Sequence, residues 1–261
     1  MSANLLEARK ISIQFGGLKA VDSLEFAVRQ GELMGLIGPN GAGKTTCFNM
    51  LTGVYQPTEG EVYFNGQSIK GLKPYQVSRL GMTRTFQNIR LFRDLNVVEN
   101  VMVAGTQHLS YGIAHPVVQS KSYFEQEKKL RDEAMSLLSI FGLEKKAHEE
   151  STSLPYGEQR KLEIVRALAT RPKMICLDEP AAGMNHSETE DLMHTIAKIR
   201  KEFNLTVMLI EHDMKLVMGI CERIVVLDHG TKIEEGTPDV IQKSAAVIEA
   251  YLGAGAAEGG H

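Results

Sequence analysis

Residues 35–46 read GLIGPNGAGKTT, and this stretch decides the fold. An apolar run ends at Gly38, a glycine-rich loop follows, and Lys44 and Thr45 open a second apolar segment. The spacing satisfies GxxxxGK[ST] between a strand and a helix, which is typical of a phosphate-binding loop. A glycine-rich turn that binds nothing is the alternative, and the strand and helix on either side argue against it.

Each residue type in this loop suits phosphate binding. Glycines let the main chain wrap phosphates closely, and the N–H groups at the helix N-terminus supply positive potential. Lys44 is expected to neutralise the β and γ oxygens of a nucleotide, and Thr45 to offer its hydroxyl to Mg²⁺. The expected phosphate contacts are Gly38, Pro39, Asn40, Gly41, Ala42, Gly43, Lys44, Thr45 and Thr46.

A second motif follows another apolar run, at residues 174–180, which read MICLDEP. Ligands of open α/β sheets lie at the carboxyl edge of the strands, where Asp178 and Glu179 are expected. Asp178 is suited to hold Mg²⁺ through its water shell, and Glu179 to polarise an attacking water as general base. Alone, the motif is typical of a solvated acidic strand end. Its pairing with the glycine-rich loop favours the catalytic interpretation.

The order of apolar patterns predicts an α/β fold. The first third alternates short apolar runs with turn signals such as Asn65-Gly66, which favours a small antiparallel sheet. From Ser151 onward, helical patterns alternate with unbroken apolar runs at 173–178, 205–212 and 223–230. Such alternation indicates a parallel sheet covered on both faces.

Residues 88–150 are expected to form a mainly helical insertion. The stretch 122–143 has the periodicity of an amphipathic helix. Its apolar positions are Leu130, Ala134, Leu137, Leu138 and Phe141. The small, polar tail at 253–261 has nothing to pack and is expected to be mobile.

Composition excludes several classes of protein. The 261 residues include 29 Lys plus Arg and 32 Asp plus Glu, a net charge of −3, so nucleic acid is not an expected partner. With 43% hydrophobic and 23% charged residues, the chain is neither disordered nor fibrous. It lacks a membrane-spanning run and the apolar core of a signal peptide, which predicts a cytosolic protein. Its three scattered cysteines fit a reducing compartment, and Cys176 is expected to be a small buried hydrophobe.

Further short motifs resemble those of the ATPase subunits of ATP-binding cassette (ABC) transporters, from about Leu5 to Leu252. Besides the two motifs above, these are Phe15, Gln87 in TFQN, LPYGE at 154–158, the loop at 180–185 and His212 in IEHD. They occur in the family's order. The resemblance implies ATP and Mg²⁺ as ligands, ATP hydrolysis as the activity, and a P-loop NTPase (RecA-like) core with a small antiparallel β subdomain and a helical insertion.

The resemblance also implies roles for single residues. Phe15 would stack on adenine, although from the sequence alone an aromatic in a strand is more often packed in the core. Gln87 would bind the metal, link the nucleotide to a membrane partner and so contribute to catalysis, as would Lys44. His212 would hold the water and Glu179 in line, a positioning role. Without the resemblance, Gln87 and His212 would be ordinary polar groups.

The segment 154–158 departs from the usual LSGGQ pattern of this superfamily and reads LPYGE. A hydroxyl is missing, and Pro155 lacks an N–H. If this loop binds the γ-phosphate, the donors must come from Gly157 and from the helix turn that begins around Glu158. The alternative is a plain helix entry shaped by Pro155 and Gly157.

The ATPases of this family work as pairs, with each nucleotide between the phosphate loop of one subunit and the LSGGQ segment of the other. The resemblance therefore implies a homodimer or heterodimer with a second ATPase subunit. It also implies permease subunits in the membrane and, indirectly, a periplasmic binding protein. The chain is then expected in the cytoplasm, held peripherally on the inner face of the cell membrane by the permeases.

Within the family, the chain looks closest to the ATPase subunits of high-affinity branched-chain amino-acid importers. The stretches that carry this likeness are TRTFQNIRLFRDLNVVENV, YGEQRKLEIVRAL, DEPAAGMN, IEHDMKLVMGI and IEAYLG. Importers of other amino acids, amides or urea and the lipopolysaccharide exporter remain alternatives. A soluble ABC scaffold or regulator and a small-molecule kinase are alternatives of other classes, and a water-activating Glu179 argues against the kinase.

The expected domain organisation follows from the same resemblance. One ABC ATPase domain spans residues 1–252, with a nucleotide-binding core at 1–87 and 160–252 and a helical subdomain at about 88–159. The segment 83–101 mixes Arg84, Arg90 and Arg93 with apolar residues, which suits an exposed partner interface. An amphipathic stretch that closes the insertion's own core is the equal alternative.

Overall fold

The computed structural model describes residues 3–108 and 121–258. The chain divides into two compact units. The unit of residues 1–84, 173–180 and 196–261 is called here the sheet unit, and that of residues 85–172 and 181–195 the helical unit. Helix α7 (His186–Glu202) begins in the helical unit and ends in the sheet unit.

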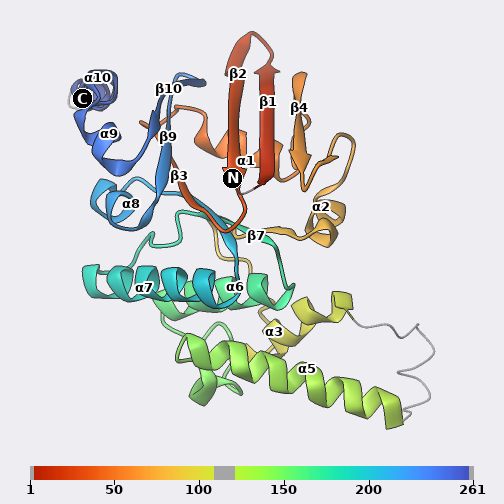
Figure 1. The fold of residues 1–261 in the computed structure, drawn as a ribbon. Coiled ribbons are helices and arrows are strands. Elements are labelled where there is room, and N and C mark those ends of the chain that lie inside the picture. Colours follow the sequence, from red (N-terminus) through yellow and green to blue (C-terminus); the bar gives the residue numbers. More distant parts are fainter. Residues whose placement is uncertain (1–2, 109–120, 259–261) are drawn as a thin grey trace. The chain divides into compact units, whose positions relative to one another are not determined.

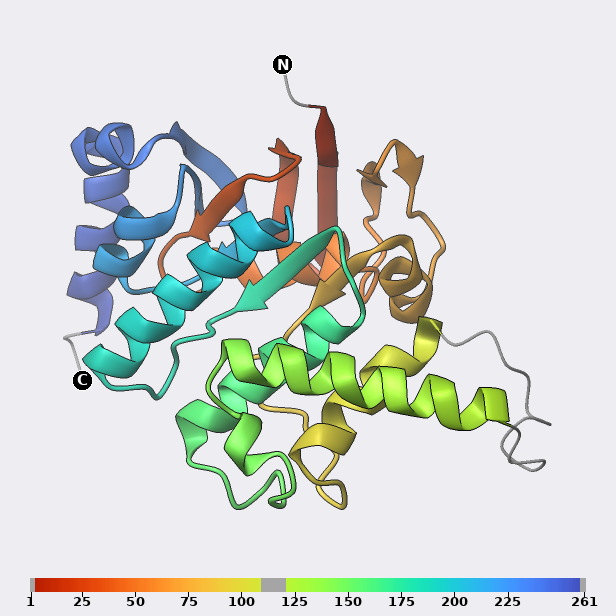
Figure 2. The ribbon, with the colours of Figure 1, turned by 60° about the horizontal axis from the view of Figure 1, so that its bottom comes forward.

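The helical unit is built on three helices that contact one another, α3, α5 and α6 (Figures 1 and 2). Its elements are α3 (Val97–Gly105), a 3₁₀ turn η1 (Thr106–His108), α5 (Lys121–Ile140), a 3₁₀ turn η2 (Glu144–Lys146) and α6 (Tyr156–Ala169). A capping box begins α3, because the Asn96 side chain accepts from the Glu99 N–H and the Glu99 carboxylate accepts from the Asn96 N–H.

The apolar stripe expected along 122–143 is the buried face of α5 and the turn after it. Leu130, Ala134, Leu138 and Phe141 are buried, and only Leu137 is half exposed. The positions three and four residues apart lie on one face of the helix, as the amphipathic pattern requires. Part of the expected helical insertion, residues 109–120, lies outside the described residues.

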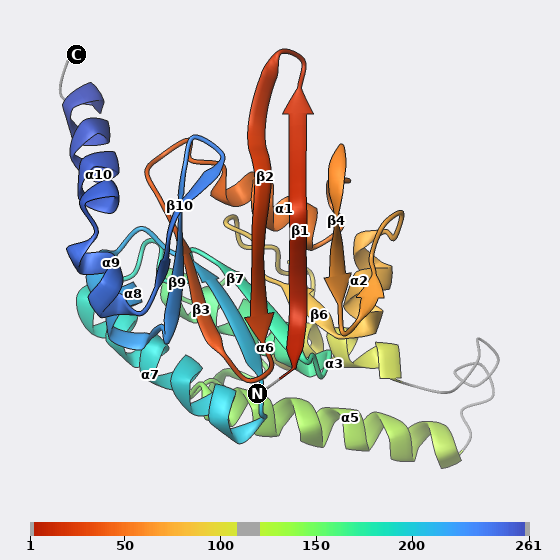
Figure 3. The ribbon, with the colours of Figure 1, turned by 45° about the horizontal axis from the view of Figure 1, so that its top comes forward.

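The sheet unit contains two sheets (Figure 3). The antiparallel sheet has the strand order β2-β1-β4-β5. Its strands are β1 (Asn4–Phe15), β2 (Leu18–Arg29), β4 (Glu59–Phe64) and β5 (Gln67–Ser68). The Asn65-Gly66 dipeptide joins β4 to β5 with both residues at positive φ, as a tight hairpin turn requires, so the predicted hairpin is confirmed.

The second sheet has the strand order β10-β9-β3-β8-β7-β6. Its strands are β3 (Leu33–Ile37), β6 (Met82–Arg84), β7 (Met174–Asp178), β8 (Thr206–Ile210), β9 (Arg223–Asp228) and β10 (Thr231–Gly236). All neighbours pair in parallel except β9 and β10. Every residue of β3, β7 and β8 is buried, which explains their unbroken apolar sequences.

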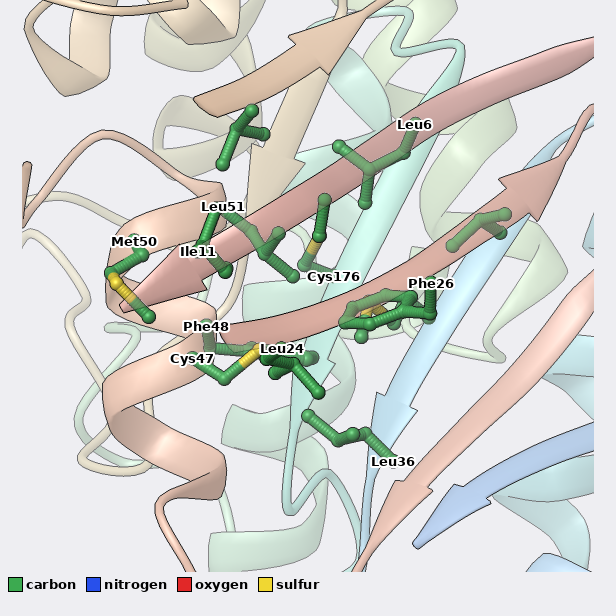
Figure 4. Packing of buried hydrophobic residues seen from close by; sticks show 14 of the residues in the cluster. Leu6, Ile11, Leu24, Phe26, Leu36, Cys47, Phe48, Met50, Leu51 and Cys176 are labelled. Atoms are coloured by element: carbon green, nitrogen blue, oxygen red, sulfur yellow. The ribbon is translucent and has the colours of Figure 1, made fainter. Parts of the chain in front are cut away.

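The hydrophobic core of the sheet unit joins both sheets to helix α1 (Lys44–Leu51) (Figure 4). Phe48 of α1 is fully buried together with Leu24 of β2 and Cys176 of β7. All three cysteines are buried, and burial raises the pKa of the Cys176 thiol to about 12, with Asp178 adding to the rise and Arg84 opposing it. Cys176 is therefore the small core residue that the sequence predicted.

Four further helices belong to the sheet unit: α2 (Pro74–Leu80), α8 (Met214–Ile220), α9 (Pro238–Lys243) and α10 (Ala245–Glu258). Helix α10 reaches into the tail at 253–261, so the backbone of residues 253–258 is helical, where the sequence predicted a mobile end. The short strand β6 and the antiparallel β10 were not predicted either. Within residues 3–108 and 121–258, no helix combines the length and apolar character needed to cross a bilayer.

Candidate functional site

The candidate site lies in the sheet unit, at the carboxyl ends of adjacent parallel strands. Strand β3 leads into the glycine-rich loop, and its neighbour β8 ends two residues before His212. Strand β7, which pairs with β8, ends at Asp178. The carboxyl ends of parallel strands share one edge of a sheet, so the loop, Asp178, Glu179 and His212 come from the same edge.

Two glycines in the loop occupy positions that no side chain fits. Gly38 has φ 152°, and a Cβ there would lie 2.1 Å from the Leu227 carbonyl oxygen. Gly43 has φ 94°, and its Cβ would lie 2.7 Å from the Ala20 carbonyl oxygen. Both conformations are natural only for glycine. Gly41 is also at positive φ, but nothing lies within 4 Å of its Cβ position.

Lys44 is the first residue of α1 and is almost fully buried. Its ammonium group donates to two carbonyl oxygens of the loop, at 2.7 Å to Gly38 and at 2.9 Å to Pro39. Burial lowers the pKa of Lys44, and the nearby charges of Glu179 and Asp178 oppose that shift. Thr45, the next residue on α1, is exposed.

Asp178 and Glu179 differ in environment although they are adjacent. Asp178 is the last residue of β7 and is buried, whereas Glu179 is half-buried. Glu179 has φ 46°, a left-handed backbone conformation that is rare outside glycine, and its N–H donates to the Ile210 carbonyl at 3.0 Å. Strained backbone of this kind is concentrated at functional sites, where it aims a side chain.

Arg84, the last residue of β6, contacts Asp178. Its Nη2 lies 2.6 Å from Asp178 Oδ2, and both side chains are buried. Its Nη1 donates to the Asn49 Oδ1 of α1 at 2.5 Å, and Thr52 Oγ1 lies 3.4 Å away. The expectation that Arg84 contributes to an exposed partner surface is therefore wrong, because its charge is satisfied inside the sheet unit.

His212 is exposed, and its Nδ1 lies 3.8 Å from a carboxylate oxygen of buried Glu211. The adjacent Asp213 caps helix α8 by accepting the N–H groups of Lys215 and Leu216. Asp213 therefore has a structural role that the sequence left open.

Phe15 ends strand β1 and is 46% exposed. Its ring packs edge-on against Tyr55, with centroids 5.4 Å apart. The interpretation of Phe15 as a core residue is therefore wrong, and its exposure is compatible with the stacking role that the resemblance implies. Tyr55 carries no motif and was not expected in this position.

Gln87 belongs to the helical unit, where α6 holds the main chain around it. Arg160 donates to the carbonyl oxygens of Phe86, at 2.8 Å, and of Gln87. Glu163 accepts the Phe86 N–H at 3.3 Å and pairs with Arg160 at 3.4 Å. Burial raises the pKa of Glu163, and the hydrogen bond from Phe86 and the charge of Arg160 oppose that shift.

We call this set of contacts, made by Arg160, Glu163 and Arg166, the α6 clamp. Arg166 donates to the Arg90 carbonyl and lies 4.7 Å from the centre of the Phe92 ring. The clamp holds residues 86–90 through hydrogen bonds to both backbone N–H and backbone C=O groups. Arg90 and Phe92 are exposed, which favours the first of the two alternatives that the sequence left open, a mixed arginine and apolar surface.

Gly157 and Glu158 lie in the first turn of α6, with Pro155 as its N-cap. A Cβ on Gly157 would lie 3.4 Å from the Glu188 carboxyl group, in ordinary van der Waals contact. The Glu158 carboxylate accepts two bonds from Lys146 Nζ, at 2.8 and 2.6 Å. The Glu158 side chain is thus engaged within the helical unit.

Tyr251 on α10 is a neighbour of the loop that sequence motifs did not reveal. Burial raises its pKa to about 12, and the nearby backbone of Gly38 opposes that shift. Its hydroxyl oxygen is buried and makes no hydrogen bond to the described residues, so α10 lies near the first glycine of the loop without bonding to it. An isolated tyrosine near the end of a sequence carries no signal for such a contact.

Two family models match the chain. One, described as ABC transporter, matches residues 21–182. The other, described as branched-chain amino acid ATP-binding cassette transporter, matches residues 231–257. These two matches cover the loop, the Asp178-Glu179 motif and part of α10.

Curated relatives match over nearly the whole chain. The high-affinity branched-chain amino acid transport ATP-binding protein LivG of Escherichia coli K12 is 45% identical over 97% of this chain and 99% of its own length. BraF of Pseudomonas aeruginosa, which has the same description, gives the same values. The lipopolysaccharide export system ATP-binding protein LptB of E. coli is 32% identical over 95% of this chain and 97% of its own.

A solved structure of an ATP-binding cassette of an ABC transporter, in its ADP conformation, has a TM-score of 0.83 and 28% identity. The match covers 97% of this chain and 100% of the other. A nucleotide-free ATP-binding cassette gives a TM-score of 0.82 at the same identity.

Proposed function

Because the chain belongs to the ABC transporter family, as one of its ATPases, we propose that it powers an importer of branched-chain amino acids. The observation that carries this choice is the 45% identity to LivG over almost the whole length of both chains. The family model for branched-chain amino acid cassettes at residues 231–257 supports it. The 32% identity to LptB is lower, so lipopolysaccharide export is less well supported.

The nucleotide would bind along the glycine-rich loop. Lys44 would leave the carbonyl oxygens of Gly38 and Pro39 and bind the β and γ oxygens. Exposed Phe15 offers its face to adenine, a stacking contact that needs no further change of the strand. The remaining contacts would come from the loop N–H groups, at Asn40, Gly41, Ala42, Gly43 and Thr46.

The donor set fits Mg²⁺ that arrives with a nucleotide. Among the described residues, no group of three or more His, Cys, Asp or Glu side chains forms a metal cage. Mg²⁺ keeps several waters and needs only one or two protein ligands when phosphates supply the others. The Thr45 hydroxyl and the Asp178 carboxylate, both in the sheet unit, provide such a pair. The ion would neutralise charge on the phosphate oxygens.

Hydrolysis would depend on Glu179 as the general base. Its left-handed backbone directs a half-buried carboxylate from the strand edge, and His212 would hold the attacking water in line. Gly157 and Glu158, in the first turn of α6, would contact the nucleotide bound by a second ATPase subunit, with the Gly157 N–H as the main donor. The Glu158 carboxylate is paired with Lys146 and its N–H donates to the Pro155 carbonyl, so Glu158 would exchange one of these contacts for the nucleotide.

The remaining partners are permease subunits in the membrane and, through them, a periplasmic binding protein. Gln87 and the exposed Arg90 and Phe92 offer the surface for a permease. The chain would then lie on the cytoplasmic face of the inner membrane.

Import by the assembled complex tests the proposal. The chain is co-expressed with the permeases and binding protein encoded beside it, and the complex is placed in vesicles that contain ATP. We expect uptake of labelled leucine that competes with isoleucine and valine, but not with urea. ATP-driven uptake of urea without leucine, or a stable complex that lacks membrane proteins, would overturn the assignment.

A further inference from the structure

Arg84 connects three elements around Asp178. Its guanidinium group bonds Asp178 of β7 at 2.6 Å and Asn49 of α1 at 2.5 Å. It also lies 5.6 Å from the centre of the Phe48 ring. Helix α1 carries Thr45, so Arg84 joins the two elements that provide the proposed metal ligands, Thr45 and Asp178.

Stability alone is a weak reason for this arrangement. The Arg84 and Asp178 side chains are 7% and 3% exposed, so both charges have lost most of their water. A buried ion pair rarely stabilises a fold more than apolar residues of the same volume would. A function for the charge of Arg84 is therefore worth seeking at the metal site.

Two positive side chains offset the carboxylates of Asp178 and Glu179 in the absence of nucleotide. Asp178 and Glu179 bring two negative charges, and Arg84 and Lys44 bring two positive ones, while the buried carboxylate of Glu211 lies 3.8 Å from His212 Nδ1. Lys44 is close enough to both carboxylates for their charges to act on it. A free divalent cation gains little from such a neutral set, whereas the phosphates of ATP add the negative charge that attracts it.

We propose that Arg84 is a positioning residue that shares the charge of Asp178 until ATP arrives, so that the metal binds with the nucleotide and not before it. This inference rests on the proposed function. The guanidinium group of Arg84 also bonds Asn49 on α1 and Thr52 directly after it. These bonds hold the Asp178 carboxylate in one position relative to α1. When the metal binds with ATP, the Asp178 carboxylate is already oriented.

The test measures Mn²⁺, a paramagnetic substitute for Mg²⁺, on the nucleotide-free chain by electron paramagnetic resonance. Wild type and Arg84→Lys, which both keep a cation, should bind Mn²⁺ weakly. Arg84→Gln removes the charge and should bind Mn²⁺ at least about tenfold more tightly. Arg84→Met is a second neutral variant, with the same expectation, should Arg84→Gln fail to fold.

A second measurement compares ATP affinity in Mg²⁺ with that in EDTA. Linkage requires that metal and ATP strengthen each other's binding by the same factor. That factor should fall in Arg84→Gln, where metal binds without ATP, and should remain near the wild-type value in Arg84→Lys. Adding Asp178→Asn to Arg84→Gln should abolish the extra Mn²⁺ binding, which assigns it to this carboxylate.

The outcomes separate the inference from the proposed function. Equal Mn²⁺ affinity in wild type, Arg84→Lys and a folded neutral variant, with ATP binding intact, would overturn the inference alone. Extra Mn²⁺ binding that survives Asp178→Asn would overturn it as well. A wild-type chain that binds no ATP in Mg²⁺ would overturn the proposed function.

Discussion

Lys44 donates to two carbonyl oxygens of its own loop, an arrangement that phosphate oxygens can replace. Its pKa is lowered chiefly by burial, and the carboxylates of Glu179 and Asp178 counteract the change. The two carboxylates that oppose this lowering of the pKa are those proposed to activate water and to bind metal. The loop therefore holds the Lys44 ammonium group before a nucleotide binds, and Lys44 would exchange its two carbonyl acceptors for phosphate oxygens.

The two loop glycines Gly38 and Gly41 offer a matched pair of substitutions. Gly41→Ala has open space and should cost about 1 kcal/mol of unfolding free energy through backbone strain. Gly38→Ala would force a Cβ against the Leu227 carbonyl and should cost more than about 3 kcal/mol. Urea unfolding of both variants measures the difference. Equal losses would mean that the loop relaxes around Gly38.

Motifs predicted single residues well where the backbone demands one residue type. The GxxxxGK[ST] spacing located Gly38 and Gly43, whose conformations only glycine adopts. The partners of charged residues were not predictable, because Arg84 and Asp178 are 94 positions apart in the chain and meet only through strand pairing. Arg84 therefore looked like a surface arginine in the sequence.

The α6 clamp binds helix α6 to the segment that contains Gln87. Arg160 and Glu163 are buried in the helical unit, and they satisfy backbone groups that would otherwise lack partners. Because Gly157 and Arg160 belong to the same short helix, the first turn of α6 and the Gln87 segment are mechanically linked. We expect the two to move together.

Arg160→Ala tests the clamp. It leaves the Glu163 carboxylate buried and unpaired, so we expect a loss of about 3 kcal/mol or more in unfolding free energy. The double variant Arg160→Ala with Glu163→Gln should lose less, because the unpaired charge is gone. Lys161→Ala, on the same helix, is the control and should change stability by less than about 0.5 kcal/mol. Chemical denaturation of these three variants and of Glu163→Gln alone gives the four values. A double variant as unstable as the sum of the single ones would contradict the coupling.

Periodicity predicted the elements more reliably than their ends. The buried strands β3, β7 and β8 and the apolar face of α5 follow from runs and spacings in the sequence. The three-residue strand β6 could not be found, because a run that short carries no period. Helix α10 extends over small residues that suggested a mobile tail, since weak local preference did not prevent the helix from continuing.

The whole ATPase is expected to work as a pair, because the chain carries both the phosphate loop and the α6 N-terminus that would complete a partner's site. Glu179→Gln should keep ATP binding but slow hydrolysis by at least about 100-fold, since it removes the general base. It should also accumulate an ATP-bound dimer, which size-exclusion chromatography with light scattering detects. Glu190→Gln, an exposed carboxylate on α7, is the control. Unaltered hydrolysis in Glu179→Gln would assign the base to another residue.

The proposed docking of a triphosphate on the loop is tested by calorimetric titration of wild type and Lys44→Ala with ATP in Mg²⁺. Lys70→Ala, an exposed lysine, is the control, and melting curves verify that each variant is folded. We expect wild type and Lys70→Ala to bind alike and Lys44→Ala to bind at least about tenfold more weakly, because a charge-assisted contact to phosphate is lost. A folded Lys44→Ala variant with wild-type affinity would contradict the proposed site.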